Sequence, residues 1–298
     1  MRDEIRKIQE LMETAEYVTD APVATSVHLA MRLRKPLLIE GPAGVGKTEV
    51  AKVMARMLGT NLIRLQCYEG LDVSTALYEW NYQKQLLHIK LEETGHNNRP
   101  VGEKEHEIFS EPFLLRRPLL QAITQHDQSP VLLVDEADRA DEEFEAFMLE
   151  VFSDWQVTIP EIGTIKATHP PHVVITSNRT RELSDALRRR CLYLWIDYPS
   201  LEKELRILER KVPGINARLA REIAKFMETL RHVRLAKVPG VAETLDWAQA
   251  LVSLHADHLD EPLVAETLGC FLKDADDLKR FRAEVVKAGL TPFLPVQG

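Results

Sequence analysis

The hydrophobic pattern of the first 60 residues predicts two helices, then a strand, a glycine-rich turn and a third helix. Apolar residues recur at helical spacing within residues 5–15 and again within residues 23–30. Residues 36–40 form a short, mostly apolar run that is followed by Gly41, and residues 47–58 have a helical composition that stops at Gly59. The order of strand, turn and helix makes one βα unit.

Three later apolar runs are continuous rather than alternating. They cover residues 62–67, 130–134 and 172–177, and unbroken runs of this kind are typical of parallel strands buried on both faces. Residues 157–167 instead alternate about a turn, which predicts a β-hairpin that projects from the sheet. The fold class expected from these elements is α/β, with a central parallel sheet flanked by helices.

Strand signals end near residue 200. From Leu201 onward the apolar residues are spaced as in helices. The segment Tyr198-Pro199-Ser200 marks the boundary, because the residue before proline is biased out of helix and serine is a good N-cap. We therefore expect an α/β core over residues 1–199 and a smaller all-α lid domain over residues 200–298.

Composition and charge exclude several classes of protein. The 298 residues are 45% hydrophobic and 28% charged, which excludes disorder, collagen and coiled-coil rods as the main architecture. The net charge of −8 has the wrong sign for a general nucleic-acid coat. No apolar run approaches the roughly 18 residues of a membrane span, so we expect a cytoplasmic protein. Cys67, Cys191 and Cys270 show no CxxC spacing, which indicates free thiols in a reducing compartment and no structural zinc.

The turn after the first expected strand carries the most specific motif of the chain. It fits GxxxxGK[ST] and lies after a strand and at the start of a helix, as the motif's mechanism requires. Its glycines let backbone N–H groups wrap phosphates, Lys47 reaches the β- and γ-phosphates, and Thr48 offers a hydroxyl to Mg²⁺. We therefore expect ATP and Mg²⁺ as cofactors. The expected nucleotide-binding residues of the loop are Gly41, Pro42, Ala43, Gly44, Val45, Gly46, Lys47 and Thr48.

Two adjacent carboxylates follow the apolar run at residues 131–134. Asp135 is expected to hold Mg²⁺ through water, and Glu136 to orient and deprotonate the water that attacks the γ-phosphate. Together with a phosphate loop, this pair favours ATP hydrolysis over phosphoryl transfer to a metabolite. Residues 135–138 also spell DEAD, but the chain lacks the SAT and HRIGR-like motifs of RNA helicases and is too short for two helicase lobes.

Two weaker polar signals follow the run that ends at Ser177. Asn178 could contact the γ-phosphate or hold the attacking water, although asparagine after a strand is also a common turn residue. The adjacent Arg188, Arg189 and Arg190 are either a solvated helix end or an arginine finger offered to a neighbouring subunit. Residue type alone does not decide between these readings.

These elements, in this order, resemble the AAA+ ATPases, and the details over about residues 20–260 are similar to the MoxR group, nearest to its CoxD-like branch. The resemblance implies that Asn178 takes the sensor 1 position and Arg190 the finger position, with Arg189 as the reserve. It also matches residues 78–102 to the helix 2 insert, which faces the ring pore in that family. The segments that carry the resemblance are 40–48, 109–113, 131–139, 157–167 and 183–191, with 65–80 and 243–247 nearest to the CoxD-like branch.

One segment departs from the family pattern. AAA+ lids usually carry a sensor 2 arginine at the start of a helix, where this sequence reads Pro239-Gly240-Val241-Ala242-Glu243-Thr244. The coupling between lid and γ-phosphate is therefore either missing or supplied by another arginine.

The resemblance implies an ATP-hydrolysing ring, expected to be a hexamer, because an arginine finger completes each site from a neighbouring subunit. MoxR-type ATPases act as chaperones in metalloenzyme assembly, commonly with a partner that bears a von Willebrand factor A (VWA) domain. The CoxD-like branch is linked to maturation of the molybdenum- and copper-containing active site of CO dehydrogenase. Two alternatives stay open: a DNA-acting AAA+ motor or clamp loader, which the net charge disfavours, and a non-catalytic nucleotide-gated scaffold, which the intact Asp135 and Glu136 disfavour.

Overall fold

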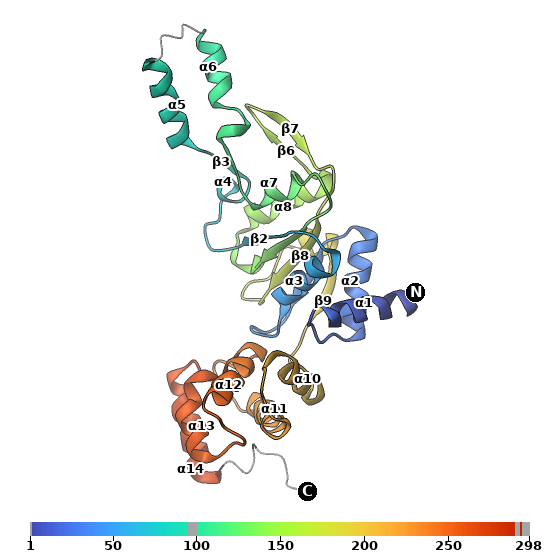
Figure 1. The fold of residues 1–298 in the computed structure, drawn as a ribbon, viewed down its shortest axis with the longest axis vertical. Helices are drawn as coiled ribbons and strands as arrows, with labels where there is room; N and C mark the ends of the chain where they lie inside the picture. Colours follow the sequence, from blue (N-terminus) through green and yellow to red (C-terminus); the bar gives the residue numbers. More distant parts are fainter. Residues whose placement is uncertain (1, 95–99, 290–292, 294–298) are drawn as a thin grey trace. The chain divides into compact units, whose positions relative to one another are not determined.

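The structure is a computed structural model that describes residues 2–94, 100–289 and 293 (Figure 1). The chain divides into two compact units, each with its own hydrophobic core. The helical unit comprises Met1–Ala24, Gly41–Val50 and Trp195–Gly298, and the sheet unit comprises Thr25–Glu40 and Ala51–Leu194.

The sheet unit is built on a five-stranded sheet with the strand order β2-β5-β8-β1-β9. β1 and β5 are buried along their whole length, and both are apolar up to their last residues, Glu40 and Asp135, as continuous hydrophobic runs predict. The register pairs Leu37 of β1 with Val174 of β8, and Val131 of β5 with His172 of β8, in parallel. The predicted α/β fold with a central parallel sheet is confirmed. The strands are β1 (Leu37–Glu40), β2 (Leu62–Gln66), β5 (Val131–Asp135), β8 (His172–Ser177) and β9 (Leu192–Trp195).

Several helices of this unit begin at residues whose side chains cap them. Asp141 precedes α8 (Glu142–Asp154), and its carboxylate accepts a hydrogen bond from the backbone N–H of Phe144 at 2.8 Å. Phe144 and Met148 of α8 are buried in the core of the sheet unit. Apart from a helical hairpin within residues 82–108, the helices that lie wholly or partly in this unit are α2 (Ala21–Leu33), α3 (Lys47–Leu58), α4 (Val73–Ala76), α7 (Pro118–Ile123), α8 and α9 (Asp185–Arg190), with 3-10 turns η1 (Glu111–Phe113) and η2 (Ala137–Arg139).

Two excursions leave the central sheet. The predicted hairpin is present as antiparallel β6 (Gln156–Ile159) and β7 (Gly163–Lys166). The second excursion is a helical hairpin, α5 (Tyr82–Thr94) and α6 (Val101–Ile108), drawn in teal where it projects away from the sheet (Figure 1). A short antiparallel pair of strands at its base, β3 (Tyr78–Trp80) and β4 (Leu114–Arg116), was not foreseen from the sequence. This excursion includes residues 78–102, for which the resemblance implies a helix 2 insert; that identity stays a prediction, and residues 95–99 lie outside the described residues.

The C-terminal part of the helical unit is all-α, as predicted. Trp247 is fully buried, with its ring centroid 4.9 Å from that of Phe226, and its indole N–H donates to Thr267 at 2.8 Å. Ser200 caps the first lid helix, because its hydroxyl accepts from the N–H of Lys203. The helices of this unit are α1 (Arg2–Thr14), α10 (Leu201–Lys211), α11 (Ala217–Arg231), α12 (Val241–Ser253), α13 (Glu261–Thr267) and α14 (Ala275–Ala288), with the 3-10 turn η3 (Leu268–Cys270). The domain division after residue 199 stays a prediction.

Among the described residues, no helix combines the length and the apolar character that a membrane crossing requires.

Candidate nucleotide site

The phosphate loop leaves β1 at Glu40 and ends where α3 begins at Lys47. Gly44 and Gly46 have φ angles of 75° and 93°, which side chains with a Cβ rarely adopt. A Cβ on Gly41 would lie 2.0 Å from the carbonyl oxygen of Ile196. Glycine at these positions is therefore required by backbone geometry and by close packing, as the motif demands.

The side chain of Lys47 is buried against the phosphate loop that precedes it. Its ammonium donates hydrogen bonds to the carbonyl oxygens of Gly41 at 2.8 Å and Pro42 at 2.6 Å. Hydrogen bonds between an ammonium and phosphate oxygens are stronger than those to neutral carbonyls. A polyphosphate in the loop would therefore compete favourably for this lysine.

The lid helix α12 begins directly against the phosphate loop, within the same unit. The backbone N–H of Ala242 donates to the carbonyl oxygen of Gly44 at 3.1 Å. A Cβ on Gly240 would lie 2.7 Å from the carbonyl oxygen of Ala43 and 2.8 Å from the Cα of Gly44. This contact occupies the segment where the family pattern would place a sensor 2 arginine.

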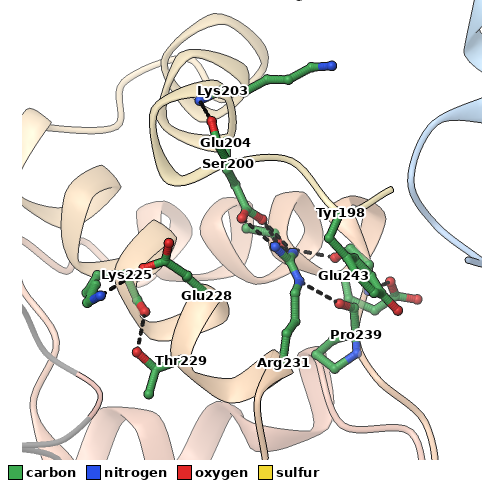
Figure 2. A network of polar contacts seen from close by, with 12 residues as sticks. Tyr198, Ser200, Lys203, Glu204, Lys225, Glu228, Thr229, Arg231, Pro239 and Glu243 are labelled. Carbon is green, nitrogen blue, oxygen red and sulfur yellow. Dashed lines mark hydrogen bonds and ion pairs between the residues drawn. The ribbon is translucent and has the colours of Figure 1, made fainter. Parts of the chain in front are cut away.

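A buried arginine holds that end of α12 in place (Figure 2). Arg231, at the end of α11, makes two hydrogen bonds of 2.6 Å to the carboxylate of Glu204 on α10. The same guanidinium donates to Thr244 at 3.1 Å and to the carbonyl oxygen of Pro239 at 3.0 Å. It also lies 5.0 Å from the ring centroid of Tyr198, a cation–π distance. Three lid helices are thereby tied together beside the phosphate loop.

Sequence reasoning missed Arg231, although it left open that another arginine serves the lid. The side chains of Arg231 and Glu204 are only 6% and 1% exposed, whereas arginine near a helix end normally points into solvent. The pattern of α11 gave no sign of this burial, because the partners come from α10 and from the segment before α12.

The second group of predicted residues lies at the carboxyl edge of the sheet. Thr176 near the end of β8 donates its hydroxyl to Asp135 at 2.5 Å and accepts a hydrogen bond from the N–H of Glu136 at 3.0 Å. One hydroxyl therefore fixes both predicted acidic residues. Sequence reasoning missed this role, because Thr176 sits within an apolar run.

The carboxylate of Asp135 is buried and paired with an arginine. Arg64 on β2 donates to its Oδ2 atom from Nε at 3.0 Å and from Nη2 at 2.6 Å. The side chain of Asp135 is 4% exposed, whereas that of Arg64 is 54% exposed. A buried carboxylate needs such a partner to offset its desolvation, and Arg64 therefore occupies one oxygen of the predicted Mg²⁺-binding group. No pattern in the sequence indicates this pair.

Glu136 adopts a strained backbone conformation, with φ 56° and ψ 50°. Residues other than glycine pay about 1–2 kcal/mol for the left-handed region, and such strain is concentrated at functional sites. The side chain is 38% exposed and lies 3.3 Å from Arg139. The carboxylate of the predicted base is thus accessible to solvent, and the guanidinium of Arg139, three residues later, lies beside it.

Asn178 is held in place by an anchor that the sequence did not reveal. Asp138, which is 4% exposed, accepts hydrogen bonds from the N–H of Asn178 at 3.2 Å and from the N–H and hydroxyl of Thr180 at 2.9 and 2.6 Å. The last residue of the DEAD tetrapeptide therefore fastens the loop after β8 to the turn after β5. This brings Asp135, Glu136 and Asn178 to one edge of the sheet unit.

The two finger candidates differ in their surroundings. Arg190 donates from Nη1 to the carbonyl oxygen of Leu149 at 3.0 Å and to the hydroxyl of Ser153 at 3.1 Å, both on α8 of the same chain. Arg189 is exposed. The roles of both arginines stay predictions, as does the joint use of the phosphate loop and the acidic edge of the sheet.

The cysteines lie outside this chemistry. Burial is the main cause that raises the thiol pKa of Cys67 to about 12, with the negative charge of Asp135 adding to it. Burial alone raises the pKa of Cys191 to about 12. Both thiols therefore stay protonated near neutral pH and are poor nucleophiles and poor metal ligands.

The sequence is similar to a known protein family and to proteins of Staphylococcus species. Residues 36–191 match the family described as AAA domain (dynein-related subfamily). An uncharacterized protein of Staphylococcus epidermidis is 23% identical over 251 residues, which cover 82% of this chain and 86% of that protein. An uncharacterized protein of Staphylococcus aureus is 24% identical over 243 residues, covering 79% and 82% of the two chains.

Solved structures share the fold at low sequence identity. Two mutants of Thermotoga maritima RuvB superimpose with TM-scores of 0.51 and 0.52, at 19% and 20% identity. The superpositions cover 96% and 92% of this chain and 76% and 77% of the RuvB chains. Because the family match spans more than half of the sequence and includes the phosphate loop and the acidic strand end, the chain belongs to the dynein-related subfamily of AAA domains.

Proposed function

We propose that this protein hydrolyses ATP within a ring and uses the reaction to remodel or mature a protein client, in the manner of the MoxR group of AAA+ ATPases. The observation that carries the proposal is the hydrogen bond from Ala242 of α12 to Gly44 of the phosphate loop. A phosphate loop that responds to nucleotide must move this helix start, and Arg231 passes the change to α10 and α11. Coupling of nucleotide state to the movement of a helical body is what a remodelling ATPase needs.

The residues present fit MgATP. The loop has the positive φ angles and the buried lysine of a phosphate-binding loop. The buried Asp135 has a carboxylate at the carboxyl end of β5. When bound, Mg²⁺ supplies charge neutralisation at the β- and γ-phosphate oxygens. Thr48 would hold it through the hydroxyl and Asp135 through water.

The remaining steps fall to side chains. Lys47 and the loop N–H groups bind the phosphates, while Glu136 takes a proton from the water that attacks the γ-phosphorus. The bond from that phosphorus to the bridging oxygen breaks, so that ADP and phosphate leave. Asn178 orients the water, and Arg190 of a neighbouring subunit stabilises the transferring group, with Arg189 as the alternative finger.

Exposed apolar side chains on α5 support a protein client. Leu86 and Leu87 are each 59% exposed and Leu91 is 62% exposed, next to the 61% exposed Tyr82. Clusters of exposed apolar residues mark interaction sites in soluble proteins. The finer parts of the proposal rest on the family resemblance: a cytoplasmic hexamer, a metalloenzyme client such as the molybdenum- and copper-containing CO dehydrogenase, and a VWA-domain partner.

The test is steady-state ATP turnover with Mg²⁺, paired with the mass of the assembly in ATP. Glu136→Gln should lower turnover by about 10²–10⁴-fold, the range of a general base, and still bind ATP. Arg190→Ala should lower turnover without loss of ATP binding, and Arg189→Ala tests the reserve finger. The exposed Glu143 on α8 offers a matched control, Glu143→Gln, which should turn over normally.

Other results would replace the proposal. ATP-dependent assembly without turnover, unaltered by Glu136→Gln, would identify a nucleotide-gated scaffold. Strong stimulation of turnover by DNA that falls steeply with salt would identify a DNA-acting motor. Normal turnover in Arg190→Ala and Arg189→Ala alike would remove the finger from the mechanism.

A further inference from the structure

A cluster of one histidine and two carboxylates lies on the helical hairpin of α5 and α6, in the projecting part of the sheet unit (Figure 1). His88 and Glu92 are one turn apart on α5, and Glu107 comes from α6. The Nε2 atom of His88 lies 3.9 Å from a carboxylate oxygen of Glu92 and 3.4 Å from one of Glu107. One ligand atom from each residue lies within 4.8 Å of the others.

These separations suit a shared metal ion better than direct hydrogen bonds. Nitrogen-to-oxygen hydrogen bonds in proteins measure about 2.7–3.2 Å, and both contacts of His88 are longer. Ligand atoms about 2.0–2.1 Å from a tetrahedral Zn²⁺ lie about 3.3 Å from each other. The spacing of His88 and Glu107 meets this value, whereas the carboxylate of Glu92, 3.9 Å from His88, would have to move closer to serve as the third ligand.

The histidine supplies a second, independent observation. Its Nε2 atom is fully buried and has no hydrogen-bond partner, although 31% of the side chain is exposed. Buried polar atoms nearly always have a partner, so a nitrogen left without one beside two carboxylates points to a ligand. The imidazole ring also packs edge-on against Phe113, with centroids 5.3 Å apart, which limits its rotation.

The donor set selects the class of ion. As metal ligands, two carboxylates and one imidazole would bring a charge of −2 to the ion, which suits a divalent cation. Nitrogen together with oxygen donors suits Zn²⁺ and its neighbours in the first transition row, whereas Mg²⁺ prefers oxygen ligands and keeps its waters. We propose that His88, Glu92 and Glu107 bind a divalent transition-metal ion of the Zn²⁺ class and leave a fourth position open to water or to a group from a bound protein.

Such an ion would clip the two helices together above their base. At the base, the side-chain amide of Gln85 donates to the carbonyl oxygen of Ile108 at 2.6 Å, and Lys84 donates to that of Pro112 at 2.8 Å. The metal would add a link one turn further along α5, beside the exposed Leu87 and Leu91. Metal occupancy would thus stiffen the surface proposed to meet a client, independently of ATP hydrolysis.

The test is titration of the full-length, tag-free and metal-stripped protein with Zn²⁺ by calorimetry, in excess Mg²⁺. Co²⁺ absorption serves as a second probe, because a tetrahedral site gives intense visible bands. We expect one ion per chain. His88→Gln and Glu107→Gln should each weaken binding by at least about 100-fold, because loss of an outer-shell partner alone costs about 10–100-fold.

The control is His106→Gln, which removes an exposed histidine from the same helix as Glu107. It should leave the affinity for Zn²⁺ unchanged. Hydrogen exchange of α5 and α6 should slow on addition of Zn²⁺ in the wild type and not in His88→Gln. ATP binding by His88→Gln should equal that of the wild type, which shows that the variant is folded. Binding that is substoichiometric, or unchanged in His88→Gln, would overturn the proposal without touching the proposed ATPase.

Discussion

The carbonyl oxygen of Gly44 in the phosphate loop accepts a hydrogen bond from the backbone N–H of Ala242 in the first turn of α12, at 3.1 Å. The first N–H groups of a helix have no partner within the helix, and here the phosphate loop provides one. The lid therefore contacts the loop through backbone atoms at the segment where sequence comparison looks for an arginine. We propose that this backbone contact couples the lid to the loop without a sensor 2 side chain in this segment.

Gly240→Ala should disturb this contact while leaving the lid folded. Gly240 has φ −88°, which alanine adopts without strain, but the new Cβ would lie 2.7 Å from the carbonyl oxygen of Ala43. Because that neighbour is backbone, the loop or the helix start must shift. We expect kcat/KM for ATP to fall about tenfold or more, equivalent to about 1.4 kcal/mol, with little change in Tm.

Gly269→Ala is the matched control, because a Cβ there meets no atom within 4 Å. Its turnover should equal that of the wild type. If Gly240→Ala also kept wild-type kcat and KM, the contact between helix and loop would have no part in turnover.

Arg231→Met should strongly destabilise the lid. It would leave Glu204, whose side chain is 1% exposed, as an unpaired buried carboxylate, and breaking one side of a buried ion pair costs about 3–5 kcal/mol. Urea unfolding followed by circular dichroism measures the loss. The double variant Arg231→Met, Glu204→Leu should recover much of this stability, since apolar replacement of a whole buried pair is often neutral.

Arg218→Met is the control for the loss of an arginine from an ion pair. It removes the pair between Arg218 and Glu222, in which the side chain of Arg218 is 60% exposed. It should cost no more than about 1 kcal/mol. If the double variant regains stability but turns over ATP slowly, Arg231 positions the start of α12. Normal turnover in the double variant would limit Arg231 to a structural role.

The sequence predicted those features that depend on local pattern. The helix at residues 47–58 has the bounds of α3, because Gly59, with φ 63°, ends it. The strand at 172–177 has the bounds of β8, because its run is continuous and apolar. The glycine-rich loop could be predicted for the same reason, because all the residues that define its motif are adjacent in the sequence.

Features that depend on partners distant in the chain were missed. Thr176 looks like one polar residue in an apolar strand, and Arg64 looks like a solvated strand residue until β2 pairs with β5. Asp138 anchors the loop after β8, and this role depends on the tertiary structure that brings the loop beside it. The short strands β3 and β4 likewise have no pattern of their own, because three residues in each are held by pairing with the other.

Arg64→Gln should change the dependence of turnover on Mg²⁺. Arg64 donates two hydrogen bonds to one oxygen of Asp135, so its positive charge competes with a cation held by that carboxylate. Removal of the charge should lower, several-fold, the Mg²⁺ concentration that gives half-maximal turnover. Arg210→Gln, the same charge change at an exposed lid position, should leave that concentration unchanged. A higher requirement for Mg²⁺ in Arg64→Gln would mean that the arginine instead holds Asp135 in its binding position.

His172 at the start of β8 should make stability depend on pH. Burial is the main cause that lowers its pKa from 6.5 to about 4, and the charge of Arg34 adds to it. The unfolded chain therefore binds a proton below pH 6.5 that the folded protein takes up only near pH 4. The stability that neutral His172 contributes is complete above pH 6.5 and is lost as the pH falls toward 4.

The window from pH 6.5 to 5 separates this effect from the titration of carboxylates, which lies lower. Across that window the urea midpoint of the wild type should fall as the pH decreases. His172→Gln should show a smaller decrease, because it removes the proton uptake of the unfolded chain, whereas His126→Gln, at an exposed position, should retain the wild-type slope. Equal slopes in wild type and His172→Gln would show that the imidazole is protonated as readily in the folded protein as in the unfolded chain, and that its burial at the start of β8 carries no linkage.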